Sequence, residues 1–327
     1  MFLDLNDLKE YSGPFMAECS NDIFQSSKYG KKYFVKKIIP RHLETIDEVI
    51  NRVNRGELIA ETLCEKGIPS IVAIKDKNGS FARLHQKNVY LVYPWYNGTI
   101  YKKDDIDADV CKRIGEILGQ IHSSNVNIES FSPLRYMPKI DVLAFNRLIN
   151  FPNYNNYSQF EVLRKTLIEN ISLFIDILPM CEKSTRFLYC EQPLVTSHTN
   201  IHHENLMHLA NEIKIIDWEF ANKTNPELEL FDLCLNWCGF SDKINWNHYN
   251  SVISGYCNTK KDFRFIHCND VINKTLYCIL SQFSYRINLF LANPQEKDIM
   301  KFVEYASQIR DLVYNRECYV ENMQLFS

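Results

Sequence analysis

Residues 194–221, LVTSHTNIHHENLMHLANEIKIIDWEFA, interrupt a part of the chain whose pattern is otherwise helical. Two β-prone segments, NLMHL and IKIIDW, flank Ala210-Asn211-Glu212, which is typical of a tight turn. Polar residues crowd just before the first segment and just after the second. A short hairpin with polar rims inside a helical region is a typical place for a functional site.

The N-terminal part of the chain is strand-rich, with one helix. The β-branched and aromatic run at 31–39 predicts a strand, and residues 47–66 predict a helix. The Asn78-Gly79 dipeptide between SIVAIKD and SFARLH predicts a β-hairpin, because this dipeptide favours the tight turn that joins two antiparallel strands. Residues 87–95 predict a further strand.

The C-terminal part is mostly helical in its apolar periodicity. Helices are expected at 109–124, 161–178, 276–290 and 302–313. Gly115 and Gly119 form a small strip that permits close contact with another helix. A length of 327 residues suits two domains of roughly 150 residues each. We therefore expect an α+β protein with one domain at 1–95 and another at 96–327.

The composition excludes several classes of protein. Lys and Arg total 37 against 40 Asp and Glu, so nucleic acid is not an expected partner. No apolar run approaches the roughly 18 residues of a membrane span, and the N-terminus lacks a signal-peptide pattern. The eleven cysteines are scattered without any C-x-x-C pair, which indicates free thiols rather than a zinc site. We expect a cytoplasmic protein that does not associate with membranes.

The segment SHTNIHHENLM, followed by IIDWEFA and NPELELFDL, resembles the aminoglycoside phosphotransferase and choline kinase family. The signature of that family is H-x-D-x-x-x-x-N followed by I-D-W/F-E, and His198, Asn205 and Asp217 match it. The resemblance implies a protein-kinase-like two-lobe fold. A small β-rich N-lobe at 1–95 would bind nucleotide, and a larger, mostly helical C-lobe at 96–327 would hold the acceptor.

The resemblance also implies an ATP-binding lysine. YFVKK resembles the family strand that carries it, which assigns the role to Lys36. Alternation along the strand puts Lys36 and Lys37 on opposite faces, so that one of them points inward. Glu57 lies on an apolar helical stripe, where a carboxylate is costly unless it is paired. We expect Glu57 to pair with Lys36, with Glu61 as the alternative partner.

Further nucleotide contacts follow from the same resemblance. SGPFMAECSNDIF resembles the phosphate-covering loop, with Ser20 and Asn21 near its turn. YLVYPWYNG resembles the hinge between the lobes, which implies that Tyr93 and Trp95 contact the nucleotide.

Asn205 and Asp217 are the candidate metal ligands. Mg²⁺ takes carboxylate, amide and phosphate oxygens, and these two side chains offer the first two. The alternative is that Asp217 caps the following turn and Asn205 satisfies loop backbone. For His198 we expect a structural role, with its ring hydrogen-bonded to backbone around the loop. The nearby histidines at 202, 203 and 208 fit no zinc spacing.

Asn200 occupies the position of the family's catalytic Asp. An Asp there would orient the substrate hydroxyl and accept its proton, whereas an amide cannot take the proton. Loss of a general base costs on the order of 10²–10⁴ in rate. Three interpretations stay open: a weak kinase that uses another base, an inactive kinase fold that binds nucleotide or ligand, and an active Asp enzyme in which Asn has been introduced.

Acidic and aromatic residues after the metal Asp suggest the acceptor. Carboxylates and tryptophans suit a cationic hydroxylated substrate, such as an aminoglycoside or a choline-like alcohol. The candidates are Glu219, Trp218, Trp237 and Trp246. The alternative is a solvated face over a helical core. The expected activity is transfer of a phosphoryl group from ATP or GTP, with Mg²⁺, to a hydroxyl of a small amine-bearing molecule.

Overall fold

A computed structural model describes residues 9–10, 22–28, 31–40, 44–128, 139–152, 160–210, 212–239 and 244–325. The chain divides into two compact units. Unit 1 comprises Met1–Asp107, Gln120–Ser130 and Val195–Lys223, and unit 2 comprises Ala108–Gly119, Phe131–Leu194 and Thr224–Ser327. The expected domain boundary at residue 95 stays a prediction.

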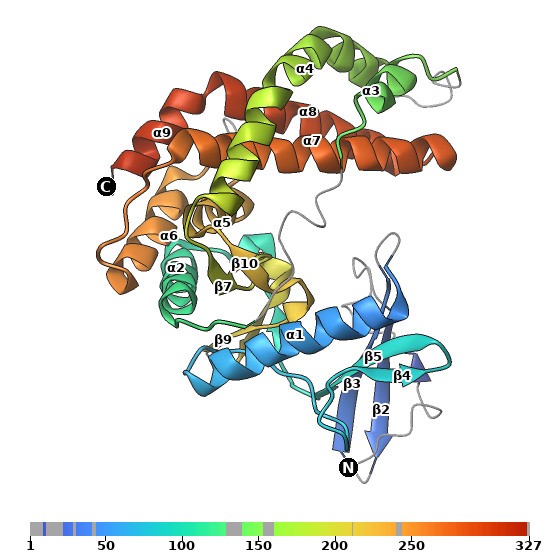
Figure 1. Ribbon diagram of the computed structural model, residues 1–327, viewed down its shortest axis with the longest axis vertical. Helices are drawn as coiled ribbons and strands as arrows, with labels where there is room; N and C mark the ends of the chain where they lie inside the picture. The colour runs from blue at the N-terminus through green and yellow to red at the C-terminus, as the bar shows by residue number, and fades with distance from the viewer. Residues whose placement is uncertain are drawn as a thin grey trace. The chain divides into compact units, whose positions relative to one another are not determined.

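A five-stranded antiparallel sheet forms the N-terminal part of unit 1, in the strand order β1-β2-β3-β5-β4 (Figure 1). Its strands are β1 (Lys9–Glu10), β2 (Asp22–Lys28), β3 (Lys31–Ile38), β4 (Arg83–His85) and β5 (Asn88–Pro94). The strands expected at 31–39 and 87–95 are therefore confirmed. They are neighbours in the sheet, with Lys36 opposite Leu91.

Helix α1 (Ile46–Glu65) crosses one face of this sheet (Figure 1). It begins with a capping box, in which the Thr45 hydroxyl accepts from the Glu48 amide and the Glu48 carboxylate accepts from the Thr45 amide. Its buried Val49 and Val53 join the core that β3 and β5 supply. The helix expected at 47–66 is confirmed.

The β-hairpin predicted around Asn78-Gly79 does not form, and the hairpin in this part of the chain lies later in the sequence. Gly79 does sit in a turn, where the Asp76 carboxylate accepts from the Asn78 and Ser80 amides. Phe81 and Ala82, which follow this turn, do not pair with a strand, because their backbone amides donate hydrogen bonds to the Asn54 side-chain oxygen. The hairpin is β4–β5 instead, and its two turn residues, 86 and 87, both have positive φ.

The hairpin predicted within residues 194–221 is confirmed. Strands β8 (Leu206–Leu209) and β9 (Glu212–Ile215) pair antiparallel, and β6 (Thr99–Ile100) pairs with β8. A parallel bridge joins Ser70 to Ile215, so this small sheet lies against the loop after α1. Its flanking elements are η2 (Lys103–Asp105), η5 (His203–Asn205), η6 (Trp218–Phe220) and the two-stranded pair β7 (Val195–Ser197) and β10 (Asn222–Thr224).

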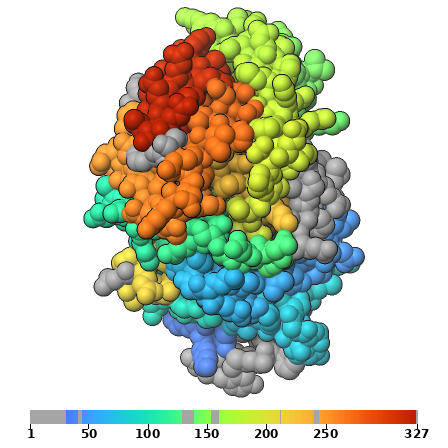
Figure 2. All heavy atoms as spheres, turned by 60° about the vertical axis from the view of Figure 1, so that its left-hand side comes forward, coloured from blue at the N-terminus to red at the C-terminus, as the bar shows by residue number. Residues whose placement is uncertain are grey.

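Unit 2 is helical. Its elements are α2 (Ala108–Ser123, whose first part belongs to this unit), α3 (Val142–Ile149), α4 (Phe160–Cys190), α5 (Pro226–Cys238), α6 (Trp246–Thr259), α7 (Cys268–Ala292), α8 (Glu296–Tyr314) and α9 (Arg316–Gln324). Helix α4 extends beyond the expected 161–178 and contains Pro179. Figure 2 shows α4 in yellow-green, α7 in orange and α8–α9 in red lying against one another. Phe145, Phe174 and Phe283 form an aromatic cluster inside this bundle.

Helices α2 and α6 cross with almost no space between their backbones. A Cβ on Gly115 would lie 2.0 Å from the Val252 carbonyl oxygen, and a Cβ on Gly255 would lie 2.0 Å from that of Lys112. Glycine on both helices therefore permits this crossing. The close helix contact expected at Gly115 is confirmed.

Candidate functional site

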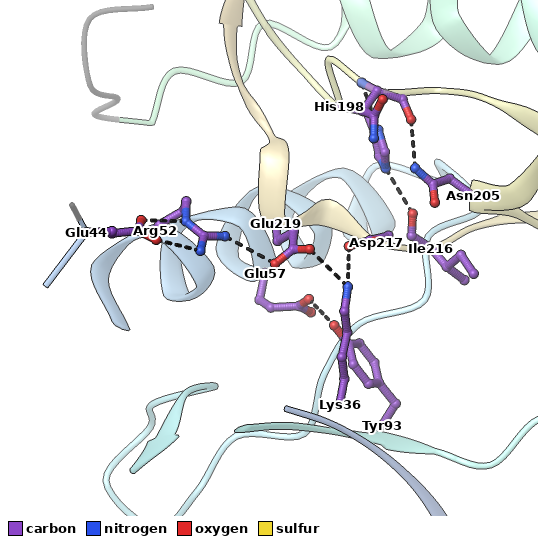
Figure 3. A network of polar contacts seen from close by, with 11 residues as sticks. Lys36, Glu44, Arg52, Glu57, Tyr93, His198, Asn205, Ile216, Asp217 and Glu219 are labelled. Atoms are coloured by element: carbon purple, nitrogen blue, oxygen red, sulfur yellow. Dashed lines mark hydrogen bonds and ion pairs between the residues drawn. The ribbon is translucent and has the colours of Figure 1, made fainter. Parts of the chain in front are cut away.

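Lys36 is buried in strand β3, whereas its neighbour Lys37 is half-buried. The side chain that points inward is therefore that of Lys36. Its Nζ lies 2.7 Å from Oδ1 of Asp217 and 3.1 Å from Oε1 of Glu219 (Figure 3). Burial by itself lowers the pKa of Lys36, but the two carboxylates outweigh burial and the pKa is raised. Lys36 is thus a buried, charged group anchored by two carboxylates.

Glu57 of α1 is fully buried, but the expected pair with Lys36 does not form. The Glu57 carboxylate accepts a hydrogen bond from the Tyr93 hydroxyl (Figure 3) and another from the Ala73 amide, each at 2.6 Å. Burial raises the pKa of Glu57 to about 7 against the opposing effect of these hydrogen bonds. The apolar stripe correctly indicated a carboxylate with partners, but the partner predicted for it was wrong. The alternative, Glu61, forms a surface ion pair with another lysine.

Glu219 occupies the place that Glu57 was expected to take beside the lysine. One of its carboxylate oxygens lies 3.1 Å from Lys36 Nζ, and the other lies 3.1 Å from Nη1 of Arg52 on α1. The remaining face of the Arg52 guanidinium donates to both carboxylate oxygens of Glu44, at 2.7 and 2.9 Å. Although burial opposes ionisation, the two cations lower the pKa of Glu219 to about 2. Glu219 therefore bridges a strand lysine and a helix arginine.

Arg52 and Glu44 are the members of this network that sequence reasoning missed. The apolar stripe predicted around Glu57 does not include Arg52, whereas the buried face of α1 does, together with Val49, Val53 and Gly56. Arg52 lies three residues after Val49 and next to Val53, so it is a charged residue on an apolar helix face, as Glu57 is. A charge on an apolar face needs a partner, and this pattern could have identified Arg52 from the sequence. The partner itself, 167 residues away, has no local signal.

Asp217 follows β9 with a left-handed backbone, φ 66° and ψ 56°. Asp adopts this conformation more readily than most residues do. Its side chain is 26% exposed, and one carboxylate oxygen is bound to Lys36. Helix α1 passes close to the next residue, because a Cβ on Gly56 would lie 2.3 Å from the Trp218 carbonyl oxygen. The carboxylate therefore projects from a segment against which α1 packs tightly.

His198 has the structural role expected of it. Its Nδ1 accepts from the Asn200 amide at 3.2 Å, so its Nε2 carries the hydrogen that is donated to the Ile216 carbonyl at 2.9 Å. The Asn205 side-chain nitrogen donates to the Asn200 carbonyl at 2.9 Å. These bonds hold the loop between β7 and β8 against the end of β9 (Figure 3).

The oxygen chemistry of the site fits a magnesium ion. Nδ2 of Asn205 donates within the loop, so its Oδ1 is the atom that could bind a metal, and Asp217 has a second carboxylate oxygen besides the one bound to Lys36. In the part of the chain that the structure describes, no group of three or more His, Cys, Asp or Glu is arranged to hold a metal. A metal here would therefore take one carboxylate, one amide oxygen and oxygens from a bound phosphate, which is a common set for Mg²⁺.

The predicted acceptor residues each have packing or ion-pair partners within their own unit. Trp218 in unit 1 is fully buried and packs edge-to-face on His198. Trp237 in unit 2 is buried, and Trp246 packs on Tyr249 of the same helix. The structure gives these tryptophans packing contacts, and Glu219 its ion pairs, so their role toward an acceptor stays a prediction.

Four further residues are predicted to contact the nucleotide, and the structure describes two of them, Tyr93 and Trp95. Tyr93 is buried with its hydroxyl on Glu57, and the Trp95 indole donates to the Asn97 side chain at 3.0 Å. Ser20 and Asn21 lie outside the described residues. Contact of any of these with a nucleotide stays a prediction.

Comparison with known proteins identifies the family. The sequence profile of the phosphotransferase enzyme family, APH, matches residues 14–247. The chain belongs to the phosphotransferase enzyme family. The predicted resemblance is therefore confirmed over most of the chain. No match was found among curated protein sequences.

Known structures share the fold of this phosphotransferase-family chain over nearly its whole length. Spectinomycin phosphotransferase APH(9)-Ia, in complex with ADP and spectinomycin, is 17% identical with a TM-score of 0.61, covering 94% of this chain and 93% of its own. A choline/ethanolamine kinase family protein from Mesorhizobium loti is 15% identical with a TM-score of 0.55, covering 97% and 92%. Amicoumacin kinase hAmiN, in complex with AMP-PNP, Ca²⁺ and Ami, is 12% identical with a TM-score of 0.58, covering 94% and 89%.

These likenesses confirm the predicted fold class. It is a protein-kinase-like α+β fold, with a small N-terminal sheet region and a predominantly helical C-terminal part. Among the described residues, none of the helices combines the length and apolar character that crossing a membrane requires.

Proposed function

We propose that the chain transfers a phosphoryl group from ATP or GTP to a hydroxyl of a small amine-bearing molecule. The observation that carries this proposal is the buried, charged Lys36, whose Nζ lies 2.7 Å from the Asp217 carboxylate in a chain of the phosphotransferase enzyme family. The positive charge of Lys36 suits the phosphates of a metal–triphosphate, and the negative charge of Asp217 suits its metal ion.

The chemistry of these residues is positioning and charge neutralisation. Lys36 would neutralise phosphate oxygens of the nucleotide, and Asp217 and Asn205 would hold Mg²⁺ through oxygen. The bound Mg²⁺ would supply charge neutralisation between the phosphates. His198 keeps Asn200 and the end of β9 in register through its two ring nitrogens. Phosphoryl transfer requires little covalent help from a protein, so these roles account for most of what the site must do.

An amine-bearing alcohol is the proposed acceptor class. The structures of similar fold include a spectinomycin phosphotransferase and a choline/ethanolamine kinase family protein, which is the basis for choosing these acceptors. Their identities of 17% and 15% leave the acceptor of this chain to experiment. We also propose that the reaction takes place in the cytoplasm, in agreement with the free thiols of the described cysteines.

A nucleotide-binding protein with impaired catalysis is the second candidate, and Asn200 favours it. The Asn200 backbone amide and carbonyl are both used within the loop, which fixes its position. Its amide side chain can orient a hydroxyl but cannot accept the proton, so a general base is missing at this position.

Calorimetric titration with Mg–ATP and Mg–GTP tests the nucleotide site. We expect saturable binding of at least one of them, weakened by about 10- to 100-fold in Lys36→Met, the equivalent of a charged hydrogen bond of about 1.5–3 kcal/mol. Asp217→Asn should weaken binding only when Mg²⁺ is present. Lys37→Met removes the same charge from the next residue and should bind like the parent chain.

Turnover with a panel of spectinomycin, aminoglycosides, choline and ethanolamine separates the two candidates. Asn200→Asp should keep the nucleotide affinity and raise phosphotransfer to one acceptor by on the order of 10²–10⁴, while Asn200→Ala should not. High turnover by the parent chain would show that Asn200 does not replace an essential base. Absence of binding to any nucleoside triphosphate would contradict both candidates.

A further inference from the structure

Among the described residues of unit 1, Arg52 is a deeply buried cation that the proposed mechanism does not use. Its side chain is 2% exposed, and three of its nitrogens donate to carboxylates on opposite sides. Two of these bonds go to Glu44, just before α1, and one goes to Glu219, after β9. The planar guanidinium reaches both carboxylates at once, which the single ammonium of a lysine cannot reproduce.

Glu219 in turn makes the second anchor of Lys36. Its Oε1 accepts from Lys36 and its Oε2 from Arg52, so each oxygen is used by one cation. Figure 3 shows the resulting row from Glu44 through Arg52 and Glu219 to Lys36, with Glu57 turned toward Tyr93. The helix next to the sheet therefore acts on Lys36 through an arginine and a bridging glutamate.

We propose that Arg52 is a positioning residue for nucleotide binding, acting on Lys36 through Glu219. This inference rests on the proposed function, because it assumes that Lys36 holds phosphate. In protein kinases a glutamate on the helix pairs directly with the strand lysine. Here the carboxylate beside Lys36 belongs to Glu219, and the helix residue that binds this carboxylate is Arg52. The helix contributes the cation, and the segment after Asp217 contributes the carboxylate.

The charges explain why the row would hold one geometry. Lys36 and Arg52 bring two positive charges, and Glu44, Asp217 and Glu219 bring three negative ones. A carboxylate as buried as Glu219 is costly without cationic partners, so loss of Arg52 would strengthen its attraction for Lys36. Lys36 would then be drawn toward the carboxylate and away from an incoming phosphate.

The test measures the dissociation constant for the Mg–nucleotide that the parent chain binds, with the melting temperature as a check of folding. Arg52→Met should raise the dissociation constant by on the order of 10- to 100-fold, the usual effect of losing an outer-shell partner. Glu219→Gln should weaken binding to a similar extent. If the two residues act in one row, Arg52→Met/Glu219→Gln should bind no worse than Glu219→Gln alone.

A control separates this row from a general effect of charge. Glu61→Gln removes a surface carboxylate of the same helix, which pairs with Lys75 and not with the row, and should leave the affinity unchanged. If Arg52→Met does not fold, Arg52→Lys replaces it. Its smaller loss should disappear when Glu219→Gln is already present.

Several outcomes would overturn the inference. One is an unchanged affinity in folded Arg52→Met. Another is a double variant whose loss is the product of the two single losses, and a third is a loss in Glu57→Gln as large as in Glu219→Gln. Failure of the parent chain to bind any nucleotide would instead remove the proposed function, and the inference with it.

Discussion

At the scale of single residues, Glu57 is a buried glutamate whose raised pKa can be measured through the pH dependence of stability. Glu57 has no exposed surface to speak of, and burial raises its pKa from an ordinary 4.5 to about 7. The Tyr93 hydroxyl and the Ala73 amide both donate to it, so each of its oxygens has a partner whether or not the carboxyl is ionised. This arrangement stabilises the position of the side chain without requiring its charge.

The pH dependence of stability should report this proton. Between pH 4.5 and about 7 the folded chain keeps a proton on Glu57 that the unfolded chain has released, so this stabilisation is complete below pH 4.5 and is lost as the pH rises to about 7. Glu57→Gln removes the titration. Relative to the parent, its free energy of unfolding should rise across this range by up to about 1.4 kcal/mol per pH unit.

Urea unfolding of both chains at a series of pH values provides the measurement. Glu61→Gln is the control, because it removes a carboxylate of the same helix at the surface. Parallel curves for Glu57→Gln and the parent would mean that Glu57 is ionised throughout this range in the folded chain.

At the scale of elements, α2 and α6 cross within unit 2 with their backbones in close contact. The carbonyl oxygens that face Gly115 and Gly255 belong to helix backbones, which cannot move aside as a side chain can. The crossing therefore depends on two glycines on two different helices, and neither helix can be moved independently to make room.

Gly115→Ala should destabilise the chain. Overpacking costs about 1–3 kcal/mol, which exceeds the gain of up to about 1 kcal/mol from the higher helix propensity of alanine. Gly119→Ala is the matched comparison on the same helix, since its Cβ would lie 2.9 Å from the Thr259 Cβ and 3.0 Å from the Tyr256 carbonyl oxygen, whereas the Cβ at position 115 would lie 2.0 Å from a carbonyl oxygen. Denaturant unfolding should show a larger loss at position 115. Equal losses, or a gain at 115, would contradict the contact.

Much of the element order was predictable from local signals. The strand at 31–39, the helix at 47–66 and the hairpin after Asn205 each follow from periodicity or turn residues within a few positions. The β4–β5 hairpin was missed because its turn, Gln86-Lys87, has positive φ without Gly, Asn or Asp. Side-chain acceptors also matter, since Asn54 binds the amides that a ladder would have used.

Some residues of the candidate site were predictable from the sequence, but Arg52, Glu44 and the pairings between residues were not. Lys36 and Asp217 were found from short motifs, and the structure brings them together. The bonds of Glu219 to Lys36 and Arg52 span 183 and 167 residues, and only the packing of α1 on the hairpin segment determines them. A carboxylate on an apolar stripe must have a partner, but its identity is a property of the tertiary structure.

For the whole molecule, the thiols give a further test. The ten described cysteines are free, and Cys64, Cys190 and Cys318 are exposed. Burial raises the pKa of Cys181 to about 12, which suppresses the reactive thiolate. Under native conditions the three exposed thiols should be alkylated first, as followed by peptide mass spectrometry. After unfolding without reductant, all eleven cysteines should react. A smaller number would indicate a disulfide.

The absence of a side chain at Gly56 has a consequence for how unit 1 moves. Helix α1 contacts the Trp218 backbone at Gly56, so no side chain of the helix separates the two backbones at this point. Within unit 1, sliding of the helix along its axis would carry the residues that follow Asp217 along with it. In protein kinases, activity is controlled through the position of a helix relative to the catalytic segment. Here the close contact at Gly56 holds α1 against the segment that follows Asp217. Displacement of α1 from this segment would have to separate two backbones that are in direct contact.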